Sequence, residues 1–408
     1  MSAPRHAPSG WSVADDCLLV GGVALPQLAE RVGRTPFYAY DRRMIDARVG
    51  ELRRHLPPLV KLHYAMKANP MPSLVAFMAG IVDGIDVASG GELTVALDAG
   101  MTPREISFAG PGKSEAELAQ ALAAGILVNL ESAREVEILS RLSRESGTPA
   151  RVAVRVNPDF ELKSSGMKMG GGPKQFGVDA EAVPALLAEI GRQGLAFEGF
   201  HIYSGSQNLK AESICEAQVK TLELARKLAR AAPSPVQVLN IGGGFGIPYF
   251  PGEEPLDLTP IGANLRELVT GCQADLPGAR LVIELGRYLV GPAGVYVCRV
   301  IDRKISRGHV FLVTDGGLHH HLAASGNFGQ VIRKNYPVQI GNRMEGARRE
   351  IASVVGPLCT PLDLLADRMD LAEAQPGDLV VVFQSGAYGF TASPHGFLSH
   401  PAPVEVLC

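Results

Sequence analysis

The chain has 408 residues and a formal net charge of −3, a length that suggests two domains with at least one large core. The near-neutral charge gives no reason to expect a nucleic-acid partner, because phosphate neutralisation needs clustered Lys and Arg. The N-terminal residues lack the apolar segment of a secretory signal, and no run approaches the roughly 20 apolar residues that span a bilayer, so we expect a cytoplasmic protein without a membrane partner.

Short apolar segments alternate with amphipathic helical stretches between residues 59 and 288. The eight segments are 59–68, 85–89, 106–110, 126–132, 151–158, 197–205, 236–244 and 280–288. This alternation predicts a parallel sheet covered by helices, and eight strands close a (β/α)8 (TIM) barrel. The stretches 114–125 and 132–147 each begin at a serine that can cap a helix and end at a glycine. We place the barrel at residues 40–285.

After about residue 288 the pattern becomes β-like, without long helices. The segments that read as strands are 295–305, 309–317, 378–388 and 402–407. They predict a second, all-β domain with a barrel-like sheet. We expect residues 17–28 to add a strand or two, so that 1–39 and 286–408 together form this domain.

The catalytic groups of such a barrel lie at the C-terminal ends of its strands. The polar residues and glycines at these ends are Lys67, Asp86 with Ser89, Arg155 with Asn157, His201 with Ser204, Gly242 to Gly244, and Glu284 with Arg287. Lys67 ends an apolar strand, where partial desolvation would favour the neutral amine that forms a Schiff base. A lysine that extends its amine into solvent is the alternative.

The glycine run 242–244 follows the seventh strand, where bare backbone N–H groups can approach a phosphate. Its spacing differs from the GxGxxG pattern of dinucleotide-binding folds. Ser204 and Arg287 could donate to the same phosphate, although Arg287 could equally form a structural ion pair.

Glu284 and His201 suit a flat, nitrogen-containing ring. A carboxylate that faces a pyridine nitrogen keeps it protonated, so that the ring can accept the electrons released by decarboxylation. An imidazole can stack on such a ring. The alternatives are a salt bridge for Glu284 and a core position for His201.

Nine ordered blocks resemble the alanine-racemase-fold (fold-type III) decarboxylases that use pyridoxal 5'-phosphate (PLP), of the diaminopimelate and ornithine decarboxylase type. They are MKAN (66–69), DVASGGE (86–92), FAGPGK (108–113), RVNP (155–158), GFHIYSGSQ (199–207), IGGGFG (241–246), ELGRY (284–288), GPLC (356–359) and GAYG (386–389). The resemblance runs from about residue 36 to the C-terminus. It implies a homodimer with shared active sites.

The resemblance also implies a role for each matching residue. Lys67 would carry PLP as a Schiff base, His201 would stack on the pyridine ring, and Glu284 would pair with the ring nitrogen. Cys359 would reach across a dimer interface as proton donor to the product. The residues that would bind the phosphate or support the cofactor are Ser204, Gly242, Gly243, Gly244, Gly286, Arg287, Tyr388, Asp86 and Arg155.

The chain departs from the family after the cysteine, where members that act on free amino acids usually carry an acid that binds the distal amine of the substrate. Here the run is CTPLD, with Thr360 at that position and Asp363 as a possible substitute. We therefore expect substrate contacts from Cys359, Thr360, Asp363 and Tyr388.

Four further blocks are similar to the branch that decarboxylates a glutamyl group on an acyl carrier protein, as in butirosin biosynthesis, and to exosortase-associated decarboxylases. They are KMGGGPKQFGVD (168–179), GGLHHHLAAS (316–325), GPLCTPLD (356–363) and FLSHPAPVEVL (397–407). A thioester-bound substrate has no distal amine, which would explain the missing acid. The alternatives are decarboxylation of free diaminopimelate, ornithine, lysine or arginine, an amino-acid racemase, and a non-catalytic PLP-binding protein.

Two further clusters allow more than one reading. A basic stretch could steer an acidic carrier protein or be a solvated loop; its members are Arg333, Lys334, Arg343, Arg348 and Arg349. The three consecutive histidines 319–321 would point in different directions on a strand, so we predict no metal site. The six scattered cysteines favour reduced thiols.

Overall fold

The computed structural model describes residues 5–7, 9–160, 167–168, 170–345 and 348–408. It divides into two compact units. The barrel unit comprises Arg48–Gly246 and Leu256–Gly286, and the β unit comprises the chain up to Ala47, Ile247–Pro255 and Arg287–Cys408. This division differs from the one drawn on the sequence at residues 40–47 and 247–255, which group with the β unit, and at Gly286, which groups with the barrel unit.

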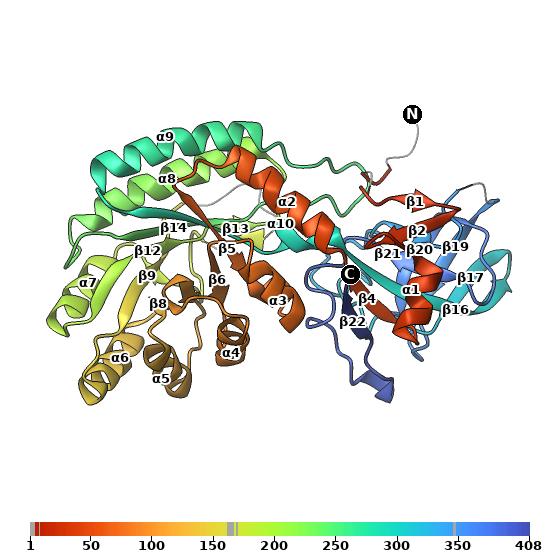
Figure 1. Cartoon of the computed structure of the whole chain (residues 1–408), viewed down its shortest axis with the longest axis horizontal. Coiled ribbons are helices and arrows are strands. Elements are labelled where there is room, and N and C mark those ends of the chain that lie inside the picture. Colours follow the sequence, from red (N-terminus) through yellow and green to blue (C-terminus); the bar gives the residue numbers. More distant parts are fainter. Residues whose placement is uncertain (1–4, 8, 161–166, 169, 346–347) are drawn as a thin grey trace. The chain divides into compact units, whose positions relative to one another are not determined.

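Eight parallel strands close into a ring in the barrel unit. Figure 1 labels several of these strands and the helices around them. In order around the ring they are β5 (Val60–Ala65), β6 (Gly84–Val87), β7 (Ile106–Phe108), β8 (Leu127–Leu130), β9 (Arg151–Asn157), β12 (Ala196–Ile202), β14 (Val238–Gly243) and β15 (Arg280–Leu285). The ring closes because β15 pairs with β5 and β8 pairs with β9. Each strand overlaps one predicted segment, so the predicted TIM barrel is confirmed.

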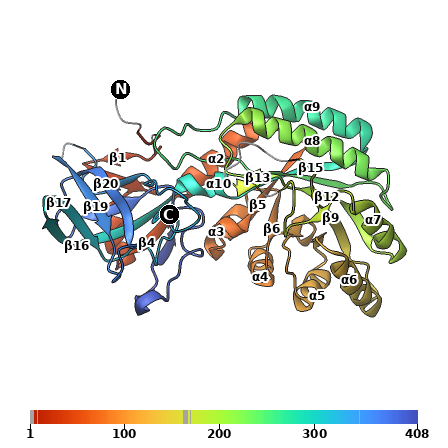
Figure 2. The same ribbon diagram turned by 180° about the vertical axis from the view of Figure 1, so that it is seen from behind.

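Helices connect these strands and lie outside them (Figure 2). They are α3 (Pro72–Ala79), α4 (Gly90–Asp98), α5 (Glu115–Ala124), α6 (Ala133–Ser146), α7 (Val183–Arg192), α8 (Ala211–Ala229) and α9 (Thr259–Asp275), and α2 (Arg42–His55) precedes β5. The predicted caps of α5 and α6 are present: Ser114 and Ser132 accept backbone N–H groups of the first turn, and Gly125 and Gly147 end the helices in the left-handed conformation.

An apolar layer fills the barrel near the beginning of its strands. Leu127, Ala153, Val238 and Val282 form one buried cluster, although they come from two separate pairs of neighbouring strands. Only side chains that point into the barrel can meet in this way. The C-terminal ends of the strands are thus left for polar residues, as expected for this fold.

The β unit contains a sheet that joins the two ends of the chain. Its strands are β4 (Phe37–Tyr40), β16 (Gly294–Ser306), β17 (His309–Thr314), β18 (Val338–Ile340), β19 (Arg349–Val355), β20 (Leu364–Ala372), β21 (Leu379–Val382) and β22 (Val404–Leu407). Strand β4 pairs antiparallel with β16 and parallel with β22.

A smaller three-stranded sheet precedes β4 in the chain. It consists of β1 (Val13–Ala14), β2 (Cys17–Val20) and β3 (Val23–Ala24), and is followed by α1 (Leu25–Val32). The second domain is therefore mostly rather than wholly β, because the stretch 17–28 supplies two strands and then begins a helix. Among the described residues, no helix is long and apolar enough to cross a membrane.

Candidate active site

The strand register brings the predicted polar residues to one level of the barrel. His201 on β12 stands beside Arg155 on β9 and beside Asn240 on β14. Glu284 on β15 stands beside Gly243 and His63. These positions are near the C-terminal ends of their strands, where a (β/α)8 barrel builds its active site.

Glu284 and His201 form the centre of this group. The Nε2 atom of His201 lies 3.3 Å from Oε2 of Glu284, and the Asn240 side-chain amide donates to the same oxygen at 3.2 Å. Burial on its own raises the pKa of Glu284, but the positive potential of His201, Lys67 and Arg155 outweighs it and holds that pKa well below its ordinary value. Glu284 is therefore an ionised, buried carboxylate.

The His201 side chain is almost completely buried, yet neither ring nitrogen makes a hydrogen bond with proper geometry to another described residue. Buried polar atoms normally find a partner, because leaving one unpaired costs about 1–3 kcal/mol. An imidazole in this state, next to an ionised carboxylate, indicates a site shaped for an aromatic or polar group from outside the chain.

Lys67 lies in a one-turn helix, η1 (Met66–Ala68), directly after β5. Its Nζ atom is 6.0 Å from the centroid of the Tyr203 ring, and its charge lowers the pKa of Glu284. The residue is exposed, which corrects the expectation of a partly desolvated amine. Because η1 turns the chain at the end of the strand, the side chain extends away from the apolar strand, and its amine is accessible.

Asp86, at the end of β6, is fixed by two buried donors. Its Oδ1 lies 3.1 Å from Nδ1 of His63 and accepts the Ser107 hydroxyl at 2.5 Å, whereas Oδ2 has no hydrogen-bond partner among the described residues. Burial lowers the pKa of His63, but Asp86, Glu105 and Glu284 together raise it more, so the net shift is upward. Asp86 is thus held rigidly, as its predicted supporting role requires.

Arg155 is held by an acid that the sequence analysis missed. Its Nη1 atom lies 2.9 Å from Glu131, which also accepts the backbone N–H groups of Gly110 and Gly177. Burial raises the pKa of Glu131, but Arg155 and Lys113 lower it further, so the carboxylate is ionised. Glu131 directly follows the last residue of β8, and this position at a strand end is the signal that could have identified it.

The glycine turn at the end of β14 has no room for side chains. Gly242 and Gly244 have φ of 68° and 74°. A Cβ on Gly242 would overlap the Tyr203 ring, and one on Gly243 or Gly244 would overlap a backbone carbonyl. A cavity of about 20 Å³ lies against Ser204, Gly243 and Gly244. The turn therefore presents bare backbone beside a small hollow, as a phosphate cradle requires.

Arg287 and Tyr388 meet within the β unit. Arg287 begins α10 (Arg287–Val290), two residues after β15 ends, and its guanidinium lies 4.6 Å from the centroid of the Tyr388 ring. It also donates to the hydroxyl of Tyr249 at 2.9 Å, a partner that the sequence analysis missed. Burial lowers the pKa of Arg287, but the two tyrosines raise it, so the cation persists.

Cys359 and Thr360 lie in the loop between β19 and β20, and Cys359 is exposed with a free thiol. Asp363 is different: it is buried, and its two oxygens accept the backbone N–H groups of Leu318 and Leu358 at 2.6 and 2.8 Å. Asp363 thus anchors two loops of the β unit. These contacts leave its predicted contact with substrate without support.

The three histidines 319–321 lie in a turn after β17 and not on a strand, which corrects the reasoning used for them. The rings of His319 and His320 are 3.6 Å apart, and burial lowers the pKa of these two residues to about 4 and about 3. In the part of the chain that the structure describes, no group of three or more His, Cys, Asp or Glu side chains is arranged for a metal ion.

The described residues fit a phosphorylated pyridine cofactor. An accessible lysine, an ionised buried carboxylate, an imidazole without hydrogen-bond partners and a glycine cradle all lie in one barrel. Together they are the groups that a barrel enzyme needs to bind such a cofactor through a lysine.

Comparison with known proteins identifies the family. Residues 42–291 match the family model described as pyridoxal-dependent decarboxylase, pyridoxal binding domain, and the chain belongs to this family of PLP-dependent decarboxylases. It is 40% identical over 379 residues to the L-glutamyl-(BtrI acyl-carrier protein) decarboxylase of Niallia circulans, with 91% of this chain and 88% of that protein covered.

Two other relatives support the same family. The diaminopimelate decarboxylase of Aquifex aeolicus is 34% identical over 396 residues, which cover 96% of this chain and 91% of that protein. The crystal structure of diaminopimelate decarboxylase from Helicobacter pylori complexed with L-lysine superposes with a TM-score of 0.82, at 27% identity, and 94% of each chain is covered.

Proposed function

We propose that this decarboxylase removes the α-carboxylate of a glutamyl group that an acyl carrier protein presents as a thioester. The observation that carries the proposal is the 40% identity, over nearly the whole chain, to a decarboxylase named for such a substrate. Thr360 after Cys359 agrees with it, because a hydroxyl cannot pair with the distal amine of a free diamino acid. Free diaminopimelate is the second candidate, since the Aquifex aeolicus relative is named for it.

PLP, when bound, accepts the electron pair that the departing carbon dioxide leaves behind. In the proposed site Lys67 would hold the cofactor covalently and His201 would stack on its ring. Glu284 is ionised and buried, so it would keep a proton on the ring nitrogen. Asp86 and Arg155, each fixed by buried partners, keep the surrounding charges in place.

We propose that the phosphate group is bound by the residues that the family resemblance implies. The glycine turn and Ser204 supply backbone N–H groups and a hydroxyl, and the buried Arg287 supplies a permanent positive charge. The complete set is Ser204, Gly242, Gly243, Gly244, Gly286, Arg287 and Tyr388.

We also propose that two copies of the chain form a homodimer with shared active sites. Cys359 of one copy then delivers its thiol proton to the α-carbon of the product bound to the other. Its exposure on a loop supports this role. Several large apolar side chains of the same unit are also exposed, as expected of a surface covered in an assembly: Phe328, Val331, Ile332, Leu362, Phe397 and Leu398.

Mixing two inactive variants tests the shared site. In an equal mixture of Lys67→Ala and Cys359→Ala, random exchange of subunits gives about one quarter of the sites both native residues. Activity should therefore recover to about one quarter of that of the native enzyme. No recovery, in a mixture shown by mass spectrometry to contain heterodimers, would contradict a site shared between subunits.

The substrate is tested by carbon dioxide release. Glutamyl-BtrI carrier protein is compared with free diaminopimelate, ornithine, lysine and arginine, and Lys67→Ala serves as the inactive control. We expect kcat/KM for the carrier-bound glutamyl group to exceed that for each free amino acid by about a hundredfold or more. Comparable turnover of a free diamino acid would end the carrier proposal and favour the second candidate.

A further inference from the structure

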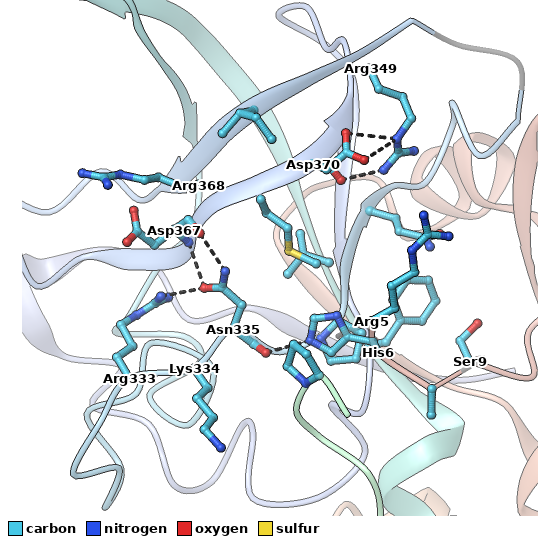
Figure 3. A pocket seen from close by; sticks show the side chains of 18 residues that line it. Arg5, His6, Ser9, Arg333, Lys334, Asn335, Arg349, Asp367, Arg368 and Asp370 are labelled. Atoms are coloured by element: carbon cyan, nitrogen blue, oxygen red, sulfur yellow. Dashed lines mark hydrogen bonds and ion pairs between the residues drawn. The ribbon is translucent and has the colours of Figure 1, made fainter. Parts of the chain in front are cut away.

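A wide cationic cleft lies in the β unit, among residues that have no part in the proposed chemistry. Its volume is about 1170 Å³. Five cationic side chains line it, from Arg5, Arg333, Lys334, Arg349 and Arg368, against the two carboxylates of Asp367 and Asp370 (Figure 3). The excess of positive charge is notable in a chain whose formal net charge is −3.

Most of these cationic side chains form no ion pair with a carboxylate of the described residues. Arg349 is paired with Asp370 at 3.1 Å. Arg333 donates to the backbone carbonyls of Ser325 and Leu364 and to Asn335, none of which carries a charge. Within the described parts of the chain, no carboxylate lies within ion-pair distance of the side chains that remain, those of Arg5, Lys334 and Arg368.

The walls of the cleft are joined to one another. The side chain of Asn335 accepts the backbone N–H of Asp367 and donates to its carbonyl, at 2.9 and 2.7 Å. The backbone carbonyl of Asn335 lies 2.9 Å from Nε2 of His6 in the N-terminal segment (Figure 3). Three separate segments are thus held in place, so a partner would meet a preformed surface.

A layer of aromatic rings connects this cleft with Arg287. Lys334 lies over Phe250, with its Nζ 5.5 Å from the ring centroid. The Phe250 ring contacts Tyr336, which packs on Tyr249 with ring centroids 4.6 Å apart. Tyr249 in turn accepts the hydrogen bond from Arg287. The cleft therefore borders the part of the β unit that carries the proposed phosphate-binding arginine.

We propose that this cleft is the docking site for an acidic surface of the carrier protein, an inference that rests on the proposed function. The cleft is larger than the roughly 300–1,000 Å³ of small-molecule pockets, so it suits a protein segment better than a single phosphate. Unpaired cations at its edge attract carboxylates over several ångströms and speed the encounter.

The five residues of the basic stretch fall into two groups, those that line the cleft and those that do not. Arg333, Lys334 and Arg349 line the cleft, whereas Arg343 pairs with Asp378 and Arg348 lies outside it, 3.8 Å from Glu373. Arg348 is 87% exposed. It is therefore a matched control, because reversing its charge changes the net charge of the protein as much as a reversal inside the cleft.

Binding of unloaded BtrI carrier protein, followed by fluorescence anisotropy with the PLP-loaded enzyme, tests the docking site. We expect Lys334→Glu and the double variant Lys334→Glu/Arg368→Glu to weaken binding progressively, to about tenfold in the double variant. Arg348→Glu should change the Kd less than twofold. Added salt should weaken binding to the native enzyme, because exposed charges are screened.

The docking proposal is overturned if the cleft variants and Arg348→Glu have the same effect, if the native enzyme does not bind the carrier, or if inorganic phosphate at millimolar concentration displaces it. Thermal unfolding confirms that the variants fold, and the single Lys334→Glu variant suffices if the double one does not. Turnover of a glutamyl-pantetheine thioester, which lacks the carrier, separates the two proposals. Turnover of this thioester without cleft-dependent binding of the carrier would contradict the docking proposal alone. Cleft-dependent binding of the carrier without decarboxylation would contradict the proposed function alone.

Discussion

Replacing Glu284 with Gln removes the carboxylate charge at the centre of the site and keeps its shape. Glu284 is ionised and buried, and a hydrogen bond to such a charged group contributes about 1.5–3 kcal/mol net. If the variant loses this stabilisation only in the transition state, kcat falls by a factor of roughly 10 to 200.

Glu198 provides the matched control for this variant. It has the same 8% exposure as Glu284, but it lies near the start of β12, paired with Arg151 at 2.6 Å. Catalytic groups in this fold lie at the C-terminal ends of the strands. Glu198→Gln should therefore lower the free energy of unfolding and leave kcat close to the native value.

The assay is carbon dioxide release under saturating substrate, with both variants loaded with PLP and checked for cofactor content by absorbance. Glu284→Gln should retain PLP while kcat falls, and KM should change little. A kcat of Glu284→Gln within about threefold of native, or an equal loss of activity in Glu198→Gln, would contradict the role of Glu284.

Two further predictions concern the glycine turn and the buried histidines. Gly244→Ala places a Cβ against the carbonyl of Gly205 at a φ of 74°, so stability should fall by about 1–3 kcal/mol and PLP affinity should drop, as measured by urea unfolding and cofactor titration; native-like values for both would contradict the cradle. Burial lowers the pKa of His321 to about 3, and its Nδ1 accepts the backbone N–H of Ala324 while Nε2 faces the Ser385 hydroxyl. The folded state thus excludes a proton that the unfolded chain takes up around pH 6.5, so the free energy of unfolding decreases as the pH is lowered, by about 1.6 kcal/mol between pH 6.5 and 5 for this residue. Urea unfolding at the two pH values should show a smaller loss in His321→Gln, and an equal loss would contradict the assignment.

The barrel and its strand-end residues were predictable from the sequence because both follow local rules. Eight apolar segments with helices between them permit few folds, and polar residues at the C-terminal ends of parallel strands must share one face of the barrel. Lys67, His201 and Glu284 were found in this way. Glu131 follows the same rule, because it comes directly after the last residue of β8, but it was not among the predicted site residues.

Other features depend on contacts between distant parts of the chain. Tyr249 reaches Arg287 because residues 247–255 belong to the β unit, which no local pattern reveals. Strands β19 and β20 were missed since charged residues such as Arg349 and Asp370 interrupt their apolar pattern. Asp363 looked like a free carboxylate, but two backbone N–H groups from separate loops occupy it.

The cationic cleft also depends on such contacts, because it joins the N-terminal segment, the stretch around Asn335 and strand β20. On the sequence alone, Arg348 and Lys334 were equivalent members of one basic stretch. Their partners in the folded chain separate them, since Lys334 borders the cleft and Arg348 lies outside it near Glu373.

The central claim is that Lys67 holds the cofactor on which this decarboxylase depends. Borohydride reduction of the PLP-loaded protein, followed by proteolysis and mass spectrometry, locates the lysine that carries the pyridoxyl group. We expect the adduct on Lys67 in the native protein, and neither adduct nor the lysine-bound cofactor absorbance in Lys67→Ala. An adduct on another lysine, or an undiminished absorbance in Lys67→Ala, would contradict it.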